Sequence, residues 1–323
     1  MRFASGDVAP RYPLPIDGQL SWQRTKRSAD NLHRVELPIP QLPKGYILVP
    51  SFSMVGASDY GFQFTLASAK RSWALAPIGQ NGPHAQSGNA PAGTDARAGN
   101  PGKALATHID YFQASRTVND MRLTLEVLSE RPPESYLLTV AARPAEISPE
   151  PGQRTSQRLT VSPLSQMTAP RNIRNHICSP TCVTMVLRHH GVTTHLGEVT
   201  RLCYHAQSRM FGVWPAALHA ASRFGAIGAV ETFSSTDVAA EIAERNIPLI
   251  ASIRHAAGEL AGACSERTGG HLVVCTGWTD DQAHVNDSRA RDPRDVCTSY
   301  DRAEFARAWL RHRGASYVLL APQ

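Results

Sequence analysis

The chain has 323 residues, of which 42% are hydrophobic, and it carries a formal net charge of +6 at pH 7 with a pI near 9.1. This length and hydrophobic content suffice for two ordinary domains. No apolar run approaches the ~20 residues of a membrane-spanning helix, the N-terminus lacks the apolar core of a signal peptide, and the dispersed arginines accompany no nucleic-acid-binding motif. We therefore expect a soluble protein without nucleic-acid partner or membrane span, either cytoplasmic or exported without a recognisable signal peptide.

The first half of the chain contains short segments with strand-like spacing and no convincing long helix. Turns with Gly and Pro separate several of them, which is typical of a β-sandwich. The long stretch 78–103 is rich in Gly, Asn, Ala and Pro, and its composition favours disorder over a functional loop. The predicted strands are 32–37, 45–54, 62–67, 72–77, 106–112, 121–128 and 136–142.

The composition changes again at 145–158, AEISPEPGQRTSQR, which is typical of a linker. We therefore predict an N-terminal extension (1–30), a β-rich, β-sandwich-like domain (31–144), a linker (145–160) and a second domain (161–323). All six cysteines lie in this last part, and their number does not suggest a disulfide scaffold.

The second domain opens with a cysteine at a predicted helix start. Cys178 precedes Ser179 and Pro180, and an apolar-periodic segment then runs to Gly191. Serine is a good helix cap, proline suits the first turn, and glycine ends helices. Cys178 should therefore lie at the N-terminal end of a buried helix, where the helix dipole and free N–H groups lower the pKa of a thiol. This is the arrangement of a nucleophilic thiolate.

The other predicted elements of this domain are helices at 214–224, 235–245 and 302–311, with Asp301 capping the last, and strands at 247–254 and 315–320. A helix first and a sheet after it agree with an α+β domain.

A predicted hairpin supplies a base for the thiol. His271 opens a strand-like segment, the residues from Thr279 onward have turn chemistry, and 283–287 forms the return strand. The predicted pairing places His271 directly opposite Asp287, and such side chains lie ~5 Å apart. Asp287 can then orient the imidazole, as in other nucleophile–base sites. A shift of one residue would bring Asn286 into the same role.

Each of these residues also has a purely structural explanation. Free cysteines are usually buried and inert, His271 can be a hydrogen-bonded residue at a strand end, and Asp287 can be a turn residue. Cys182 is a rival nucleophile, but it falls inside the predicted helix. The ordered set of nucleophile, base and orienting group nevertheless favours catalysis.

A metal site is the main chemical competitor. The spacing of the candidate ligands matches neither Cys-x-x-Cys nor His-Glu-x-x-His, and adjacent histidines on one helix point about 100° apart. We therefore predict no metal and no cofactor. The candidate ligands are His189, His190, His195, Cys203 and His205.

At the cysteine, histidine and aspartate motifs the chain resembles the bacteriocin-processing-type cysteine peptidases and their stand-alone bacterial relatives, the C39-like peptidases. The resemblance covers roughly 161–323. It is carried by Cys178-Ser-Pro-Thr, Gly270-His271-Leu-Val-Val and Val285-Asn286-Asp287. The family usually has Cys-Gly-Pro and Asp-Pro, where this chain has Cys-Ser-Pro and Asp-Ser.

The resemblance implies a papain-like fold and a glutamine, upstream of the nucleophile, that helps to form the oxyanion hole. Gln166, within Ser-Gln-Met, matches this glutamine. It can equally be an ordinary linker residue, in which case Asn172 and Asn175 are the alternatives.

We therefore predict an α+β protein in which a β-sandwich-like N-terminal domain precedes a papain-like cysteine peptidase domain. Cys178 attacks a carbonyl carbon, His271 protonates the leaving amine, Asp287 orients His271, and Gln166 binds the oxyanion. The predicted partner is a peptide or protein substrate. Amidase or isopeptidase action on cell-wall or other peptides, acyl transfer to an amine, and non-catalytic binding through the β-rich domain stay open.

Overall fold

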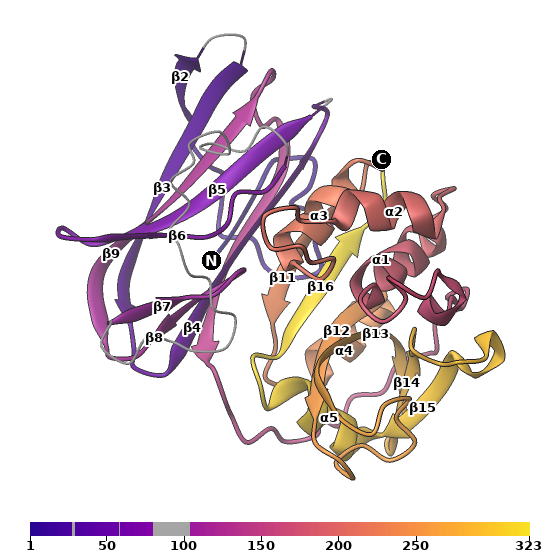
Figure 1. Cartoon of the computed structure of the whole chain (residues 1–323). Helices are drawn as coiled ribbons and strands as arrows, with labels where there is room; N and C mark the ends of the chain where they lie inside the picture. Colours follow the sequence, from indigo (N-terminus) through magenta and orange to yellow (C-terminus); the bar gives the residue numbers. More distant parts are fainter. Residues whose placement is uncertain (28–29, 58, 80–103) are drawn as a thin grey trace. The chain divides into compact units, whose positions relative to one another are not determined.

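The structure is a computed structural model that describes residues 1–27, 30–57, 59–79 and 104–323. The chain divides into two compact units, Met1–Ala145 and Glu146–Gln323 (Figure 1). The predicted disorder at 78–103 lies, from residue 80 onward, outside the described residues.

The described part of the first unit contains two five-stranded antiparallel sheets. Phe52 of one sheet and Phe62 of the other have ring centroids 5.5 Å apart, and Phe52 is 6.1 Å from Tyr60. The two sheets therefore face each other across an aromatic core. One sheet has the order β1 (Arg2–Ala4), β10 (Ser135–Pro144), β4 (Tyr46–Val55), β8 (Phe112–Ala114), β7 (Leu105–Thr107). The other has the order β2 (Gln23–Arg27), β3 (Asp30–Leu42), β9 (Val118–Ser129), β5 (Tyr60–Ala67), β6 (Ser72–Ala74).

Two features of this unit differ from the sequence-based prediction. The segment 1–30, predicted as an extension, contributes β1 and β2 to the two sheets. The single strand predicted at 106–112 is two short strands, because the chain turns between them with a hydrogen bond from His108 N to Tyr111 O of 2.9 Å.

The second unit is built on a six-stranded antiparallel sheet with helices packed against it (Figure 1). Helix α1 contacts β13, α2 and α3, whereas α4 and α5 contact β12. The strand order is β11 (Ile227–Thr232), β16 (Ala315–Leu320), β12 (Leu249–His255), β13 (Thr268–Trp278), β14 (Gln282–Asn286), β15 (Cys297–Asp301). The helices are α1 (Cys178–His189), α2 (Leu196–Cys203), α3 (Trp214–Ser222), α4 (Asp237–Glu244) and α5 (Arg302–Leu310), and two short 3-10 helices are η1 (Gln166–Thr168) and η2 (Pro293–Asp295).

Sequence patterns found most of these elements but not all. Asp301 caps α5 as expected, because its carboxylate accepts the Glu304 N–H at 2.8 Å. Helix α2 and strands β11 and β15 are not among the predicted elements, although Val199, Thr200 and Cys203 recur at helical spacing in α2 and are buried. The segment 145–160, predicted as a linker, is hydrogen bonded along the second unit, for example from Ser156 N to Trp278 O at 2.9 Å.

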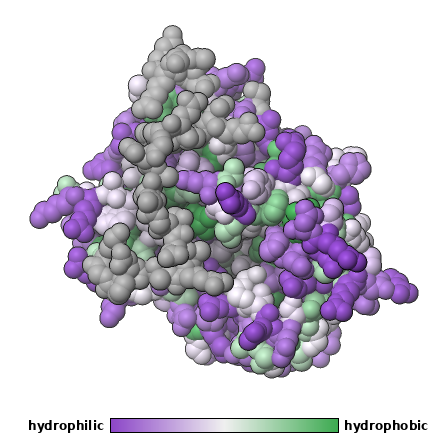
Figure 2. Space-filling model, viewed as in Figure 1, coloured by the Kyte–Doolittle hydropathy of each residue, from purple (hydrophilic) through white to green (hydrophobic). Residues whose placement is uncertain are grey.

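The described surface is mostly hydrophilic on the face seen in Figure 2. Large hydrophobic side chains that are exposed in the described residues are Met1, Tyr204 and Met210. No helix within the described ranges has both the length and the apolar character needed to cross a membrane.

Candidate active site

Cys178 is the first residue of α1, which begins two residues earlier than the predicted cap at Ser179 implies. The N-cap is Ile177, and Ser179 is not a cap but a buried residue whose hydroxyl lies 3.1 Å from the Tyr317 hydroxyl. Pro180 is still within the first turn, where its missing N–H costs no hydrogen bond. The thiol thus lies at the positive end of the helix dipole.

The Cys178 side chain is half-buried. Burial raises the pKa of its thiol, but a hydrogen bond to His271, the charge of His271 and the backbone of Leu272 and Ser179 lower it. The lowering effects win, so the pKa of Cys178 lies below its ordinary value of 9.0. The site therefore favours the thiolate.

His271 lies near the start of β13, opposite Ile253 of β12, and only 5% of it is exposed. Its Nε2 atom lies 2.7 Å from Oδ1 of Asp287. Burial lowers the pKa of the imidazole, but the charge and hydrogen bond of Asp287 and the contact with Cys178 raise it to about 10. The ring is therefore protonated at neutral pH. Because Asp287 occupies Nε2, Nδ1 is the ring nitrogen left to face the thiolate.

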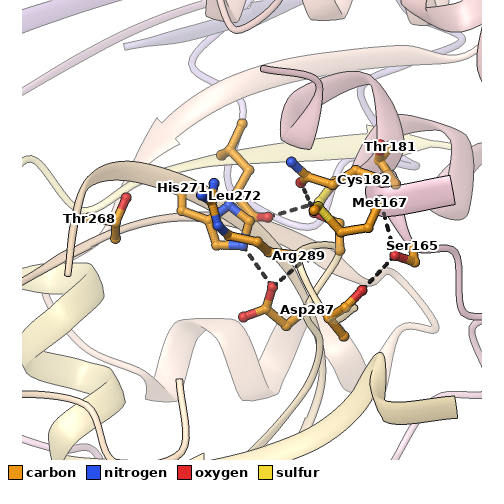
Figure 3. Close-up of polar contacts among 12 residues, drawn as sticks. Ser165, Met167, Thr181, Cys182, Thr268, His271, Leu272, Asp287 and Arg289 are labelled. Carbon is orange, nitrogen blue, oxygen red and sulfur yellow. Dashed lines mark hydrogen bonds and ion pairs between the residues drawn. The ribbon is translucent and has the colours of Figure 1, made fainter. Parts of the chain in front are cut away.

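Asp287 follows the last residue of β14 and is 2% exposed. Its Oδ1 also accepts the Arg289 N–H at 2.8 Å, and its Oδ2 accepts the Tyr300 hydroxyl at 2.7 Å. Burial raises the pKa of this carboxyl, but His271 and these two donors hold it well below its ordinary value. Figure 3 shows His271, Asp287 and Arg289 side by side.

The pairing of the hairpin differs from the prediction. The residue opposite Asn286 is Val274, so Asp287 continues the strand to the level of position 273 instead of 271. A bulge between Cys275 and Gly277 shifts the register. Asn286 turns away from His271, because its amide donates to Val161 O at 2.9 Å.

Gln166 is fully buried in η1 and is held at both ends of its amide. Its Nε2 donates to Arg174 O at 2.6 Å, and its Oε1 accepts the Ser288 hydroxyl at 2.8 Å. Its backbone N–H donates to Ser288 O at 2.8 Å. Gln166 is thereby tied to the residue that follows Asp287. The two alternatives, Asn172 and Asn175, are exposed.

Comparison with known proteins decides the family of this unit. Residues 158–317 match the model of the Peptidase_C39 like family. The second unit is a C39-like peptidase domain. The resemblance seen in the sequence is confirmed, and so is its coarser consequence, a papain-like domain of the cysteine peptidase type.

Solved structures similar to this chain include a double glycine motif protease from an AMS/PCAT transporter in complex with the leader peptide. It is 18% identical with a TM-score of 0.35, and the match covers 52% of this chain and 98% of that one. Another is a C39-like peptidase from Bacillus anthracis, 14% identical with a TM-score of 0.39, covering 51% and 98%. No curated protein matches the sequence significantly.

Cys182 occupies a different environment in the C39-like domain. It is fully buried one helical turn after Cys178, and its thiol donates to Leu272 O at 3.2 Å (Figure 3). Burial, together with the charges of Cys178 and Asp287, raises the pKa of Cys182 well above its ordinary value. It is therefore a poor nucleophile.

The histidine cluster weighed as a metal site makes ordinary structural contacts. His189 contacts Thr160 O and Asn246 O, and His190 contacts Leu319 O. Within the ranges that the structure describes, no group of three or more His, Cys, Asp or Glu side chains is arranged to hold a metal ion.

Sequence reasoning missed Tyr300 and Ser288. Tyr300 is 1% exposed on β15, and its ring stacks on Phe305 at 6.1 Å. It lies beside Asp287 because β15 pairs with β14. Detecting it would have required prediction of β15, whose segment Cys297–Asp301 has no strong alternation.

Proposed function

We propose that this protein is a cysteine peptidase with a Cys178–His271–Asp287 triad. The observation that carries the proposal is the 2.7 Å contact between His271 Nε2 and Asp287 Oδ1, next to a half-buried thiol whose pKa is lowered. A nucleophile, a base and a group that orients the base are the minimum for this chemistry.

In the proposed reaction, the Cys178 thiolate attacks the carbonyl carbon of the scissile peptide bond. The imidazolium of His271 then gives its proton to the leaving amine as the C–N bond breaks, and a thioester remains on Cys178. Water attacks this thioester, with His271 now accepting the proton, and the thiolate is released with a carboxylate product. Asp287 stays ionised and holds the ring throughout.

The oxyanion is proposed to be bound by the side chain of Gln166 and the backbone N–H of Cys178. The Gln166 Nε2 group has two hydrogens, and its bond to Arg174 O uses one. The other remains for the substrate oxygen. In comparable enzymes one such donor contributes about 3 kcal/mol to the stability of the transition state.

The substrate is proposed to be a peptide or protein, as the family implies. Cys178, His271, Asp287 and Gln166 all belong to the second unit. We propose that the two units are separate domains, that the chemistry belongs to the second, and that the β-rich unit governs substrate choice.

The test is cleavage of a mixed peptide library by the full-length protein, with products identified by mass spectrometry. Cys178→Ala should abolish cleavage, whereas the matched variant Cys182→Ala should keep it if the fold is intact by circular dichroism. Products carrying an added amine in place of water would indicate acyl transfer. If the wild-type protein cleaves no peptide, or if Cys178→Ala retains cleavage, the proposed peptidase is wrong.

A further inference from the structure

Positive charge gathers in the two segments that flank the proposed triad. The sequence contains no Asp or Glu between Glu150 and Glu198, so the segment before α1 carries Arg171 and Arg174 with no carboxylate nearby in the chain. The segment after Asp287 carries Arg289, Arg291 and Arg294 against two aspartates, one of which, Asp292, pairs with Arg294 at 2.6 Å.

Hydrogen bonds hold two of these arginines beside the site. The backbone carbonyl of Arg174 accepts the Gln166 amide at 2.6 Å. The backbone N–H of Arg289 donates to Asp287 at 2.8 Å. The backbone of Arg174 therefore lies next to the proposed oxyanion donor, and the backbone of Arg289 lies next to the orienting carboxylate.

Neither guanidinium has an ion-pair partner among the residues that the structure describes. Both side chains are half-buried, and the Nε atom of Arg174 is shielded from solvent without a hydrogen-bond acceptor. Shielding a charged donor without a partner costs free energy. The Nε atom of Arg302 is shielded in the same way, but its terminal nitrogens donate to Thr279 O at 2.7 Å and Arg154 O at 2.9 Å.

From this arrangement, and resting on the proposed peptidase function, we propose that Arg174 and Arg289 bind a carboxylate of the substrate. The preferred substrates are then peptides with Asp or Glu within a few residues of the scissile bond. A guanidinium binds a carboxylate through two parallel N–H···O bonds, which makes the contact strong and directional. The partly desolvated position of Arg174 strengthens it further.

The experiment measures kcat/KM for three peptides that are identical except for one residue near the cleavage site, which is Glu, Gln or Lys. The parent peptide comes from the library cleaved by the wild-type protein, and each flanking position is varied in turn. At one position at least, we expect Glu to exceed Gln by about tenfold or more, as for a hydrogen bond to a charged group. Lys should be worse than Gln.

Charge-reversal variants test whether Arg174 and Arg289 cause the preference for Glu. Arg174→Glu or Arg289→Glu should abolish the preference for Glu or invert it toward Lys. Arg245→Glu is the matched control, with the same change in net charge at an exposed arginine. Asn246, the residue after Arg245, contacts His189, the last residue of α1. His189 lies about 17 Å along the helix from Cys178, the first residue of α1. That separation exceeds the screening length of roughly 8 Å at physiological salt, so this variant should keep the preference.

The outcomes separate this inference from the function on which it rests. Cleavage that depends on Cys178 but shows equal rates for Glu and Gln at every position would overturn the carboxylate site and leave the peptidase standing. An equal loss of preference in Arg245→Glu would also overturn it, because net charge alone would then explain the effect. Absence of all cleavage would overturn the peptidase itself.

Discussion

His271 and Asp287 meet diagonally across the β13–β14 hairpin, two positions apart in register, with Nε2 and Oδ1 separated by 2.7 Å. Diagonal neighbours in an antiparallel pair have Cα atoms ~7–8 Å apart, and an imidazole and a carboxylate together span that gap. The Arg289 N–H donates to the same oxygen, Oδ1, and the Tyr300 hydroxyl donates to Oδ2. The ring orientation is thus set by three strands and a turn.

The first prediction concerns alkylation of Cys178. Because the pKa of Cys178 is below 9.0, its reaction with iodoacetamide should reach half of its maximal rate at a pH below that value. His271→Ala removes the stabilising charge and should move the midpoint upward. His190→Ala, at the other end of α1, is the control. The rate is measured at each pH by mass spectrometry of the Cys178 peptide. The same midpoint in His271→Ala and wild type would remove His271 from the site.

The second prediction concerns hydrolysis at high pH. The pKa of His271 is raised to about 10, so the ring loses its proton as the pH rises through that value, and kcat should fall there. Asp287→Asn removes the charge that raises this pKa while burial still lowers it. The fall in kcat should therefore move to lower pH, and the rate at pH 7 should drop roughly 100-fold or more. An alkaline limb at the same pH in both proteins would contradict this role of Asp287.

The third prediction concerns Tyr300→Phe, which removes one donor from Asp287 Oδ2. The pKa of Asp287 should rise, and the free energy of unfolding at pH 7 should fall by about 1–3 kcal/mol. The native pKa of Asp287 is depressed, so its contribution to stability is present at neutral pH and is lost as the pH falls. The difference in the free energy of unfolding between Tyr300→Phe and wild type, measured by urea melts, should therefore become smaller at acid pH. Tyr60→Phe, in the first unit, is the control and should show no such dependence on pH. If the destabilisation by Tyr300→Phe stayed constant down to pH 3, this would be evidence against the hydrogen bond between Tyr300 and Asp287.

The fourth prediction concerns Gln166→Ala. If its amide binds the oxyanion, kcat should fall by roughly 100- to 1,000-fold, while Cys178 still reacts with iodoacetamide because the His271–Asp287 pair remains. The variant also loses bonds to Arg174 and Ser288, so a thermal melt must show that the protein is folded at the assay temperature. A folded variant with the wild-type kcat would exclude Gln166 from the oxyanion hole.

The fifth prediction compares two fragments of the second unit. One that begins at Glu146 keeps the bonds from Ile147 N to Arg311 O and from Arg302 to Arg154 O. It should fold and react at Cys178 with iodoacetamide, but it should cleave the natural substrate more slowly if the first unit contributes to recognition. One that begins at Ser156 leaves the buried Arg302 short of an acceptor and should be less stable by about 1–3 kcal/mol. Equal urea midpoints for the two fragments would show that 146–155 adds nothing to the fold.

Local sequence rules were sufficient for the elements that end in clear caps or turns. Proline near a helix start and glycine at its end predicted α1, and the Asp301 carboxylate predicted the start of α5. The turn at Thr279 placed His271 and Asp287 on one hairpin, and they are hydrogen bonded. These features depend on residues close in the chain, whose backbone preferences and hydrogen bonds do not need the rest of the fold.

Only the tertiary structure decided the features that depend on distant partners. The bulge between Cys275 and Gly277 changes the register of the hairpin. Arg158 packs so closely against Gly277 that a Cβ on residue 277 would lie 2.8 Å from the Cα of Arg158. Tyr300 reaches Asp287 because β15 pairs with β14, and Gln166 reaches Ser288 across more than a hundred residues. Nothing near these residues in the sequence encodes such contacts. They form because each buried polar group must find a partner, and the packed sheet determines which partners are within reach.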